Sequence, residues 1–179
     1  PGARPNPTSN LKFDLRLIEF LDDSGAISHE GIQELKNSIK SCISESKKAK
    51  VSELLPFATS ALREASNGSE VINQINQEFG IEMQVLSGEE EAQITFLAAR
   101  RWFGWSSGRL LMIDIGGGSL ELAVGINESP DVALSLPLGA SRVTKTFLEG
   151  DPFTKKSIRK LREEIESKLS EVKIGRAHV

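Results

Sequence analysis

The sequence predicts an α/β protein with two lobes, and three observations lead to this expectation. Short apolar runs at residues 110–115 and 120–125 have the length of buried strands. Longer stretches repeat apolar residues every three or four positions, as amphipathic helices do; they cover residues 28–50, 69–79 and 152–172. A glycine- and serine-rich break at residues 104–108 separates the two halves. We therefore expect a first lobe over residues 1–103, a hinge over residues 104–108 and a second lobe over residues 109–179.

Composition and charge exclude several classes of protein. The chain has 179 residues, 39% of them hydrophobic, which is enough for one good core or two small ones. Its net charge of −3 comes from interspersed acids and bases, so nothing indicates a nucleic-acid partner. No signal peptide and no apolar segment of membrane length is seen, and the one cysteine, Cys42, fits a reducing compartment. We expect a soluble, cytoplasmic protein.

The first lobe opens with a helix that Ser28 caps at its N-terminus, followed by a strand at residues 53–58. Pro56 within that strand indicates a sheet edge or a bulge. Thr59 or Ser60 then caps a short helical turn whose N–H groups point beyond the strand end. Arg63 on this turn either reaches an anion there or pairs with a neighbouring glutamate, and the sequence leaves both readings open.

A second strand-to-helix corner carries three consecutive acids. Residues 83–86 form a strand candidate, and Ser87 and Glu90 have the spacing of a capping box at the start of the next helix. Glu89 suits the positive end of the helix dipole. Glu91 lies past both features and has no structural explanation of this kind.

The stretch from residue 110 to residue 125 carries the chemistry. Two strands flank the glycines Gly116, Gly117 and Gly118. Glycines allow a tight turn and let backbone N–H groups approach an anion closely. Asp114 ends the first strand, and alternation places Ser119 and Glu121 on one face of the second strand while its leucines and valine face a core. Carboxylates beside a phosphate cradle imply a divalent cation, usually Mg²⁺.

Two other nucleotide-binding motifs fit this stretch less well. No Gly-Lys-Ser/Thr follows the glycines, so the motif is not a P-loop, and Glu121 stands where a dinucleotide-binding fingerprint needs its third glycine. A purely structural hairpin with two surface acids remains possible on spacing alone. Beyond the motif we expect a strand at residues 132–138, a helix that begins at residues 139–142 with Arg142 near its N-terminus, and a last amphipathic helix after Pro152.

Three stretches together resemble one family. Residues 58–67, 85–92 and 113–121 are similar, in order and spacing, to the signature segments of the exopolyphosphatase/guanosine pentaphosphate phosphohydrolase (Ppx/GppA) family. Residues 137–142 followed by residues 151–152 extend the likeness over nearly the whole chain, which looks like the shorter, actinobacterial-type members.

The resemblance implies a fold and a reaction. It implies two ribonuclease-H-like lobes of the actin-like ATPase superfold, which also contains sugar kinases, Hsp70 and actin, with the substrate between them. It also implies a Mg²⁺-dependent hydrolase that releases terminal phosphate from inorganic polyphosphate, or the 5′ γ-phosphate from guanosine pentaphosphate. A homodimer is left open.

The resemblance also implies roles for single residues. Glu91 matches the catalytic glutamate that orients or deprotonates the attacking water. Asp114 and Glu121 match the acids that position metal and water, and Gly116, Gly117, Gly118 and Ser119 match the second phosphate loop. Arg63 and Arg142 are the expected contacts with the anionic substrate.

Two departures from the family pattern stand out. Leu120 replaces a common threonine, and alternation points it to the core, so we expect little consequence. The family's first phosphate loop, an Asp-x-Gly-x-Asn-Ser type segment, would lie before Pro1, and later segments are missing too. We therefore expect an incomplete fold, a fragment at both ends, that can be inactive alone. An ATP-dependent kinase and a non-catalytic polyphosphate or alarmone binder are the competing functions.

Overall fold

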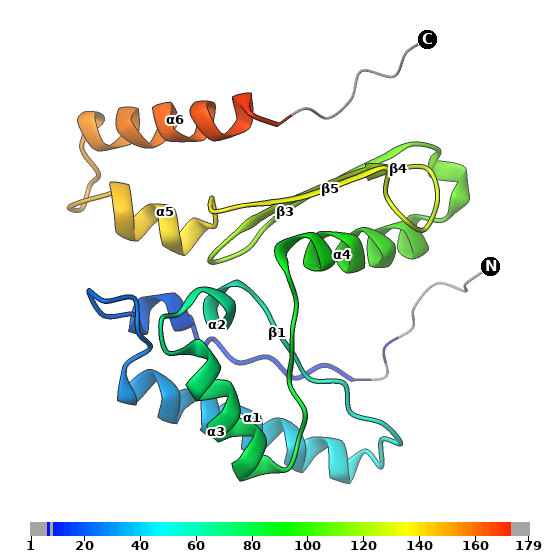
Figure 1. Cartoon of the computed structure of the whole chain (residues 1–179). Helices are drawn as coiled ribbons and strands as arrows, with labels where there is room; N and C mark the ends of the chain where they lie inside the picture. The colour runs from blue at the N-terminus through cyan, green and yellow to red at the C-terminus, as the bar shows by residue number, and fades with distance from the viewer. Residues whose placement is uncertain (1–6, 8, 173–179) are drawn as a thin grey trace. The chain divides into compact units, whose positions relative to one another are not determined.

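The computed structural model describes residue 7 and residues 9–172 (Figure 1). Its contacts divide the chain into two compact units. We call the part within residues 6–87 the N-terminal unit and the part within residues 88–179 the C-terminal unit. No helix in the described part of the chain is both long enough and apolar enough to cross a membrane.

The N-terminal unit packs three α-helices and a small parallel sheet around one core. Its elements are η1 (Leu17–Phe20), α1 (His29–Lys48), β1 (Phe57–Ala58), α2 (Ser60–Glu64), α3 (Gly68–Phe79) and β2 (Gln84–Val85). The expected N-cap is confirmed, since the Ser28 hydroxyl accepts the Gly31 N–H at 3.2 Å. β1 pairs with β2 in parallel. The core is made by Ile27, Leu35, Ala58, Leu62, Val71, Ile72 and Ile75.

Both strands of this unit are shorter than the sequence predicts. The expected strand at residues 53–58 is reduced to two residues after Pro56, and the one at residues 83–86 to two residues as well. The ladder is closed by two further bonds, from Gln84 N–H to the Pro56 carbonyl and from Leu86 N–H to the Ala58 carbonyl. Pro56 has no N–H to donate to a ladder, so it takes part only through its carbonyl.

The C-terminal unit is a three-stranded antiparallel sheet with helices. Its elements are α4 (Gly88–Phe103), η2 (Trp105–Ser107), β3 (Leu110–Ile115), β4 (Leu120–Gly125), β5 (Val132–Leu136), α5 (Ala140–Phe147) and α6 (Lys155–Ser170). The strand order is β3-β4-β5. α4 packs along one face of this sheet, where buried Phe96 contacts Met112 of β3 and Ala123 of β4 (Figure 1).

α4 is fixed to the sheet at its C-terminal end by Arg100, which is 1% exposed. Its guanidinium donates to the carbonyls of Gly108 at 2.8 Å and Gly125 at 2.9 Å. On the outer side of the helix, Arg101 donates to Glu128 at 3.0 Å, and this hydrogen bond keeps the pKa of the Glu128 carboxyl below its ordinary value.

The boundary between the two compact units differs from the predicted hinge. The expected hinge at residues 104–108 is hydrogen-bonded to α4 through Arg100, which also donates to the Ser107 hydroxyl at 2.8 Å. α4 therefore belongs with the sheet that follows it, and the compact units meet between Ser87 and Gly88. The glycines and serines at residues 104–108 signal a tight turn correctly, but the buried contacts of α4 decide to which unit it belongs.

Candidate functional site

The glycine loop, residues 116–119, joins β3 to β4 in the C-terminal unit. The two strands pair in antiparallel register, with Asp114 opposite Glu121 and Ile115 opposite Leu120. The Gly116 N–H closes the loop by donating to the Ser119 carbonyl at 3.0 Å. The predicted turn between two strands is therefore confirmed.

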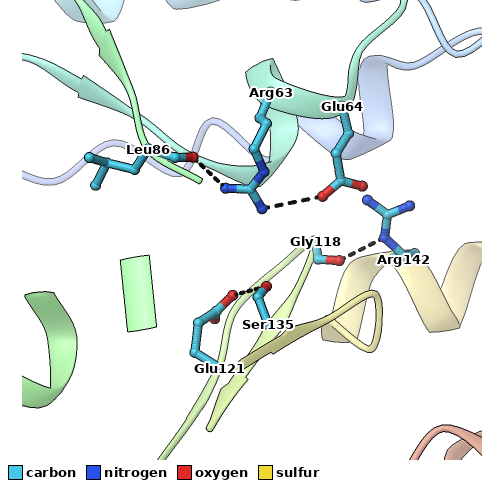
Figure 2. A network of polar contacts seen from close by, with 7 residues as sticks. All are labelled: Arg63, Glu64, Leu86, Gly118, Glu121, Ser135 and Arg142. Carbon is cyan, nitrogen blue, oxygen red and sulfur yellow. Dashed lines mark hydrogen bonds and ion pairs between the residues drawn. The ribbon is translucent and has the colours of Figure 1, made fainter. Parts of the chain in front are cut away.

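The start of α5 holds this loop through its carbonyl groups. The N–H of Ala140 donates to the Gly116 carbonyl at 2.8 Å, and the N–H of Arg142 to the Gly117 carbonyl at 3.0 Å. The Arg142 Nε donates to the Gly118 carbonyl at 2.6 Å (Figure 2). Three successive carbonyls of the loop thus point toward α5.

The opposite edge of the loop presents N–H groups. In a trans peptide the C=O of one residue and the N–H of the next point in opposite directions, and the peptide bonds of the loop are trans. The N–H groups of Gly117, Gly118 and Ser119 consequently point away from α5. None of them donates to another of the described residues. Successive, unpaired backbone N–H groups form a concavity that binds anions.

A second glycine, Gly139, makes this arrangement possible. A Cβ atom at residue 139 would lie 2.3 Å from both Gly118 C and Ser119 N. Only a residue without a side chain lets α5 begin so close to the loop. The sequence pattern at residue 139 predicts the start of a helix but not this close approach, for which a glycine at a helix start is the available signal.

The two predicted metal ligands lie side by side in the sheet. Asp114 of β3, Glu121 of β4 and Ser135 of β5 are partners in register and form one row across the three strands. Side chains alternate along a strand, so this row faces the same side as Met112 and Ala123, which pack on α4. Asp114 is exposed, whereas Glu121 is 1% exposed.

The face that carries Glu121 differs in part from the expectation. Alternation predicts that Leu120, Leu122 and Val124 face the core, yet the face of Glu121 also packs, against α4. On the other face Leu122 is buried, while Leu120 and Val124 are half-buried. The strand therefore has two partly covered faces, which alternation within one strand cannot reveal.

Glu91 is half-buried and, contrary to the expectation, still lies in the first turn of α4, at the positive end of the helix dipole. Along α4, Phe96 packs on Ala123 and Arg100 bonds to Gly125. Glu91 is five residues before Phe96, about 7.5 Å along the helix, and Glu121 is two residues before Ala123, about 6.7 Å along the strand. The first turn of α4 therefore lies level with Glu121 along the sheet. α4 begins at the end of the sheet that carries the glycine loop (Figure 1).

The acids fit a cation that is shared with a substrate. Among residues 9–172, no group of three or more histidine, cysteine or acidic side chains is arranged to hold a metal alone. Mg²⁺ is usually held by one or two carboxylates together with substrate phosphates and water. Asp114 and Glu121, paired across the strands beside the loop, provide such a donor set.

Arg63 lies in the N-terminal unit and is engaged with its own surroundings. Its Nη1 donates to the Leu86 carbonyl at 2.7 Å, and its Nη2 contacts the Glu64 carboxylate at 3.4 Å (Figure 2). The alternative that the sequence left open, a pair with a neighbouring glutamate, is therefore present. Thr59 stands at the N-cap of α2 but its side chain makes no capping bond, unlike the expectation.

Comparisons with known proteins give one consistent result. The model of the Ppx/GppA phosphatase family matches residues 2–175. Exopolyphosphatase 1 of Mycobacterium leprae is 44% identical over 173 residues, which are 97% of this chain and 51% of that protein. Exopolyphosphatase 1 of Mycobacterium tuberculosis is 45% identical over 170 residues, or 95% of this chain and 49% of that protein. The chain thus spans about half the length of the curated relatives it matches.

Solved structures agree with the sequence matches. The crystal structure of an exopolyphosphatase-like protein superposes with a TM-score of 0.81 at 26% identity, over 89% of this chain and 52% of that one. The Aquifex aeolicus member of the Ppx/GppA family gives a TM-score of 0.67 at 27% identity, over 87% of this chain and 50% of that one. The predicted α/β fold, incomplete in this chain, is confirmed.

Proposed function

Because the chain belongs to the Ppx/GppA phosphatase family, we propose that the protein it comes from hydrolyses the terminal phosphoanhydride bond of inorganic polyphosphate. The observation that supports this most is the unpaired set of N–H groups at Gly117, Gly118 and Ser119. The names of the relatives, exopolyphosphatase 1, support polyphosphate as the substrate class.

The glycine loop binds the terminal phosphate in this proposal. Its N–H groups donate to phosphate oxygens, and their direction is set beforehand by the bonds from α5 to the loop carbonyls. Preorganised donors of this kind stabilise the charge on a transferring phosphoryl group without reorganisation during the reaction. Arg142 acts at the same place by holding the Gly118 carbonyl.

Asp114 and Glu121 hold the divalent cation in this proposal. Mg²⁺, when bound, neutralises charge on the phosphate oxygens. Glu91 acts as the base. A water molecule attacks the terminal phosphorus, its proton passes to the Glu91 carboxylate, and the bond from phosphorus to the bridging oxygen breaks. The products are orthophosphate and a polyphosphate chain shorter by one unit. A base must lie within hydrogen-bond reach of the water, and Glu91 lies in the first turn of α4, which is level with Glu121.

The test uses the full-length protein with Mg²⁺ and long-chain polyphosphate, and measures phosphate release together with polyphosphate binding. Glu91→Gln is the variant, and Glu89→Gln is the matched control, since Glu89 lies in the same turn, is exposed and accepts a hydrogen bond from Gln93. We expect Glu91→Gln to lower kcat by about 10²-fold or more with binding largely kept, because general-base catalysis contributes that much. Glu89→Gln stays near wild type.

The other outcomes separate the competing functions. Binding of polyphosphate by the wild type without any phosphate release would replace the hydrolase with a binding module. Faster phosphate release from guanosine pentaphosphate than from polyphosphate would identify the nucleotide as the preferred substrate. Formation of ADP from ATP and a sugar would indicate a kinase. A wild type that is active and a Glu91→Gln variant that is equally active would leave the hydrolase standing but contradict the role of Glu91.

A further inference from the structure

The carboxylate of Glu121 is buried and is held by a hydroxyl. Glu121 is 1% exposed, and the Ser135 hydroxyl lies 2.8 Å from its Oε1 (Figure 2). This is the one side-chain hydrogen bond that Glu121 makes with the described residues. The Ser135 hydroxyl donates this bond, and the carboxylate oxygen accepts it.

Ser135 is suited to fix the direction of this carboxylate. It lies on β5 directly opposite Glu121, within a ladder that pairs five residues of each strand. A glutamate has three rotatable bonds and a serine has one, so a strand-bound serine limits the orientations of the longer side chain. A hydrogen bond to a charged group is also roughly twice as strong as one between neutral groups.

We propose that Ser135 is a positioning residue of the hydrolytic site. Its hydroxyl donates to Oε1 of Glu121 and thereby holds the carboxylate in one orientation. The other carboxylate oxygen is then available to bind the cation or the water. Ser135 touches neither substrate nor reacting atoms, and it acts only through Glu121. The inference rests on the proposed function of Glu121 and adds to it a residue that no sequence motif marked.

The test compares Ser135→Thr with Ser135→Val in the full-length protein. Threonine and valine have almost the same shape and both suit a strand, so the pair differs chiefly in the hydroxyl. We expect Ser135→Thr to keep most of the activity on polyphosphate. Ser135→Val should lower kcat by about 10- to 100-fold, the usual strength of a hydrogen bond to a charged group, with KM changed less than about twofold.

Ser135→Ala is the second variant, in case the valine does not fit, and thermal unfolding checks that each variant is folded. Ser135→Ala should behave like Ser135→Val in kcat. Equal kcat for the threonine, valine and alanine variants, with an active wild type, would overturn the role of Ser135 alone. A wild type that hydrolyses neither polyphosphate nor guanosine pentaphosphate would remove the proposed function and this inference together.

Discussion

The glycine loop and the Arg63 corner were both expected to bind an anion, and the structure builds them differently. At the loop, residues 116–119, the backbone provides the donors, and its carbonyls are already bonded to α5. At the corner, residues 59–63, the donor is one long side chain that is bonded to the Leu86 carbonyl and close to Glu64. The loop therefore offers unpaired donors, and the corner offers a donor already engaged.

This difference has an energetic meaning. Backbone N–H groups in a closed loop lose little freedom when an anion binds, and they need not move toward a developing charge. An arginine that is hydrogen-bonded to a carbonyl must share or give up that contact to bind another group. We therefore expect the loop to determine the rate of phosphate release and Arg63 to modulate the affinity for the anionic chain.

The largest effect is expected from Gly139→Ala, which crowds the loop backbone, including the Ser119 N atom. The added methyl group would lie 2.3 Å from the backbone of Gly118 and Ser119, so either the loop or α5 must shift. Overpacking of this kind costs about 1–3 kcal/mol of stability. We expect a lowered Tm and a fall in kcat/KM of about 10²-fold, measured by thermal unfolding and by phosphate release.

Gly117→Ala is the stability control for this variant. A Cβ at residue 117 would make an ordinary contact of 3.6 Å with the Ser141 hydroxyl, so its Tm should stay near that of the wild type. If Gly139→Ala and Gly117→Ala unfold at the same temperature, and Gly139→Ala keeps full activity, the close approach of α5 is not what orders the loop.

Smaller effects on kcat and KM are expected from replacing Arg142 and Arg63, and they differ between the two residues. Arg142→Ala removes the bond from Nε to the Gly118 carbonyl but keeps the backbone bond to Gly117, so we expect kcat/KM to fall by about 10- to 100-fold, mostly through kcat. Arg63→Ala should raise KM by about tenfold or less and change kcat little. Steady-state kinetics on polyphosphate measures both. A larger loss of kcat in Arg63→Ala than in Arg142→Ala would reverse the comparison.

Local patterns predicted the elements of the site well. The strands on both sides of the glycines, the capped helix after Ser28 and the helix start near Arg142 depend on neighbouring residues, and all are found. The ordered motifs also predicted the family, and the model of that family matches residues 2–175. These features are determined by residues that are close together in the sequence.

Features that depend on distant contacts were missed. Ser135 meets Glu121 only because β5 pairs with β4 in one register, and Gly139 approaches Gly118 only after α5 folds back on the loop. The unit boundary at Gly88 depends on the contacts of Phe96 and Arg100 with the sheet. Strand register and helix docking are set by packing between distant segments. Local sequence patterns carry no information about that packing.

The most direct measurement follows the amide groups of the loop themselves. The full-length protein, labelled with ¹⁵N-glycine, would be titrated with tripolyphosphate and observed by NMR, with Gly25 and Gly80 as internal controls, since both lie in the N-terminal unit away from the loop sequence. We predict that the signals of Gly117 and Gly118 shift with a common saturation curve while those of Gly25 and Gly80 stay in place. Saturable binding that leaves Gly117 and Gly118 unshifted would contradict the account that this loop holds the phosphate.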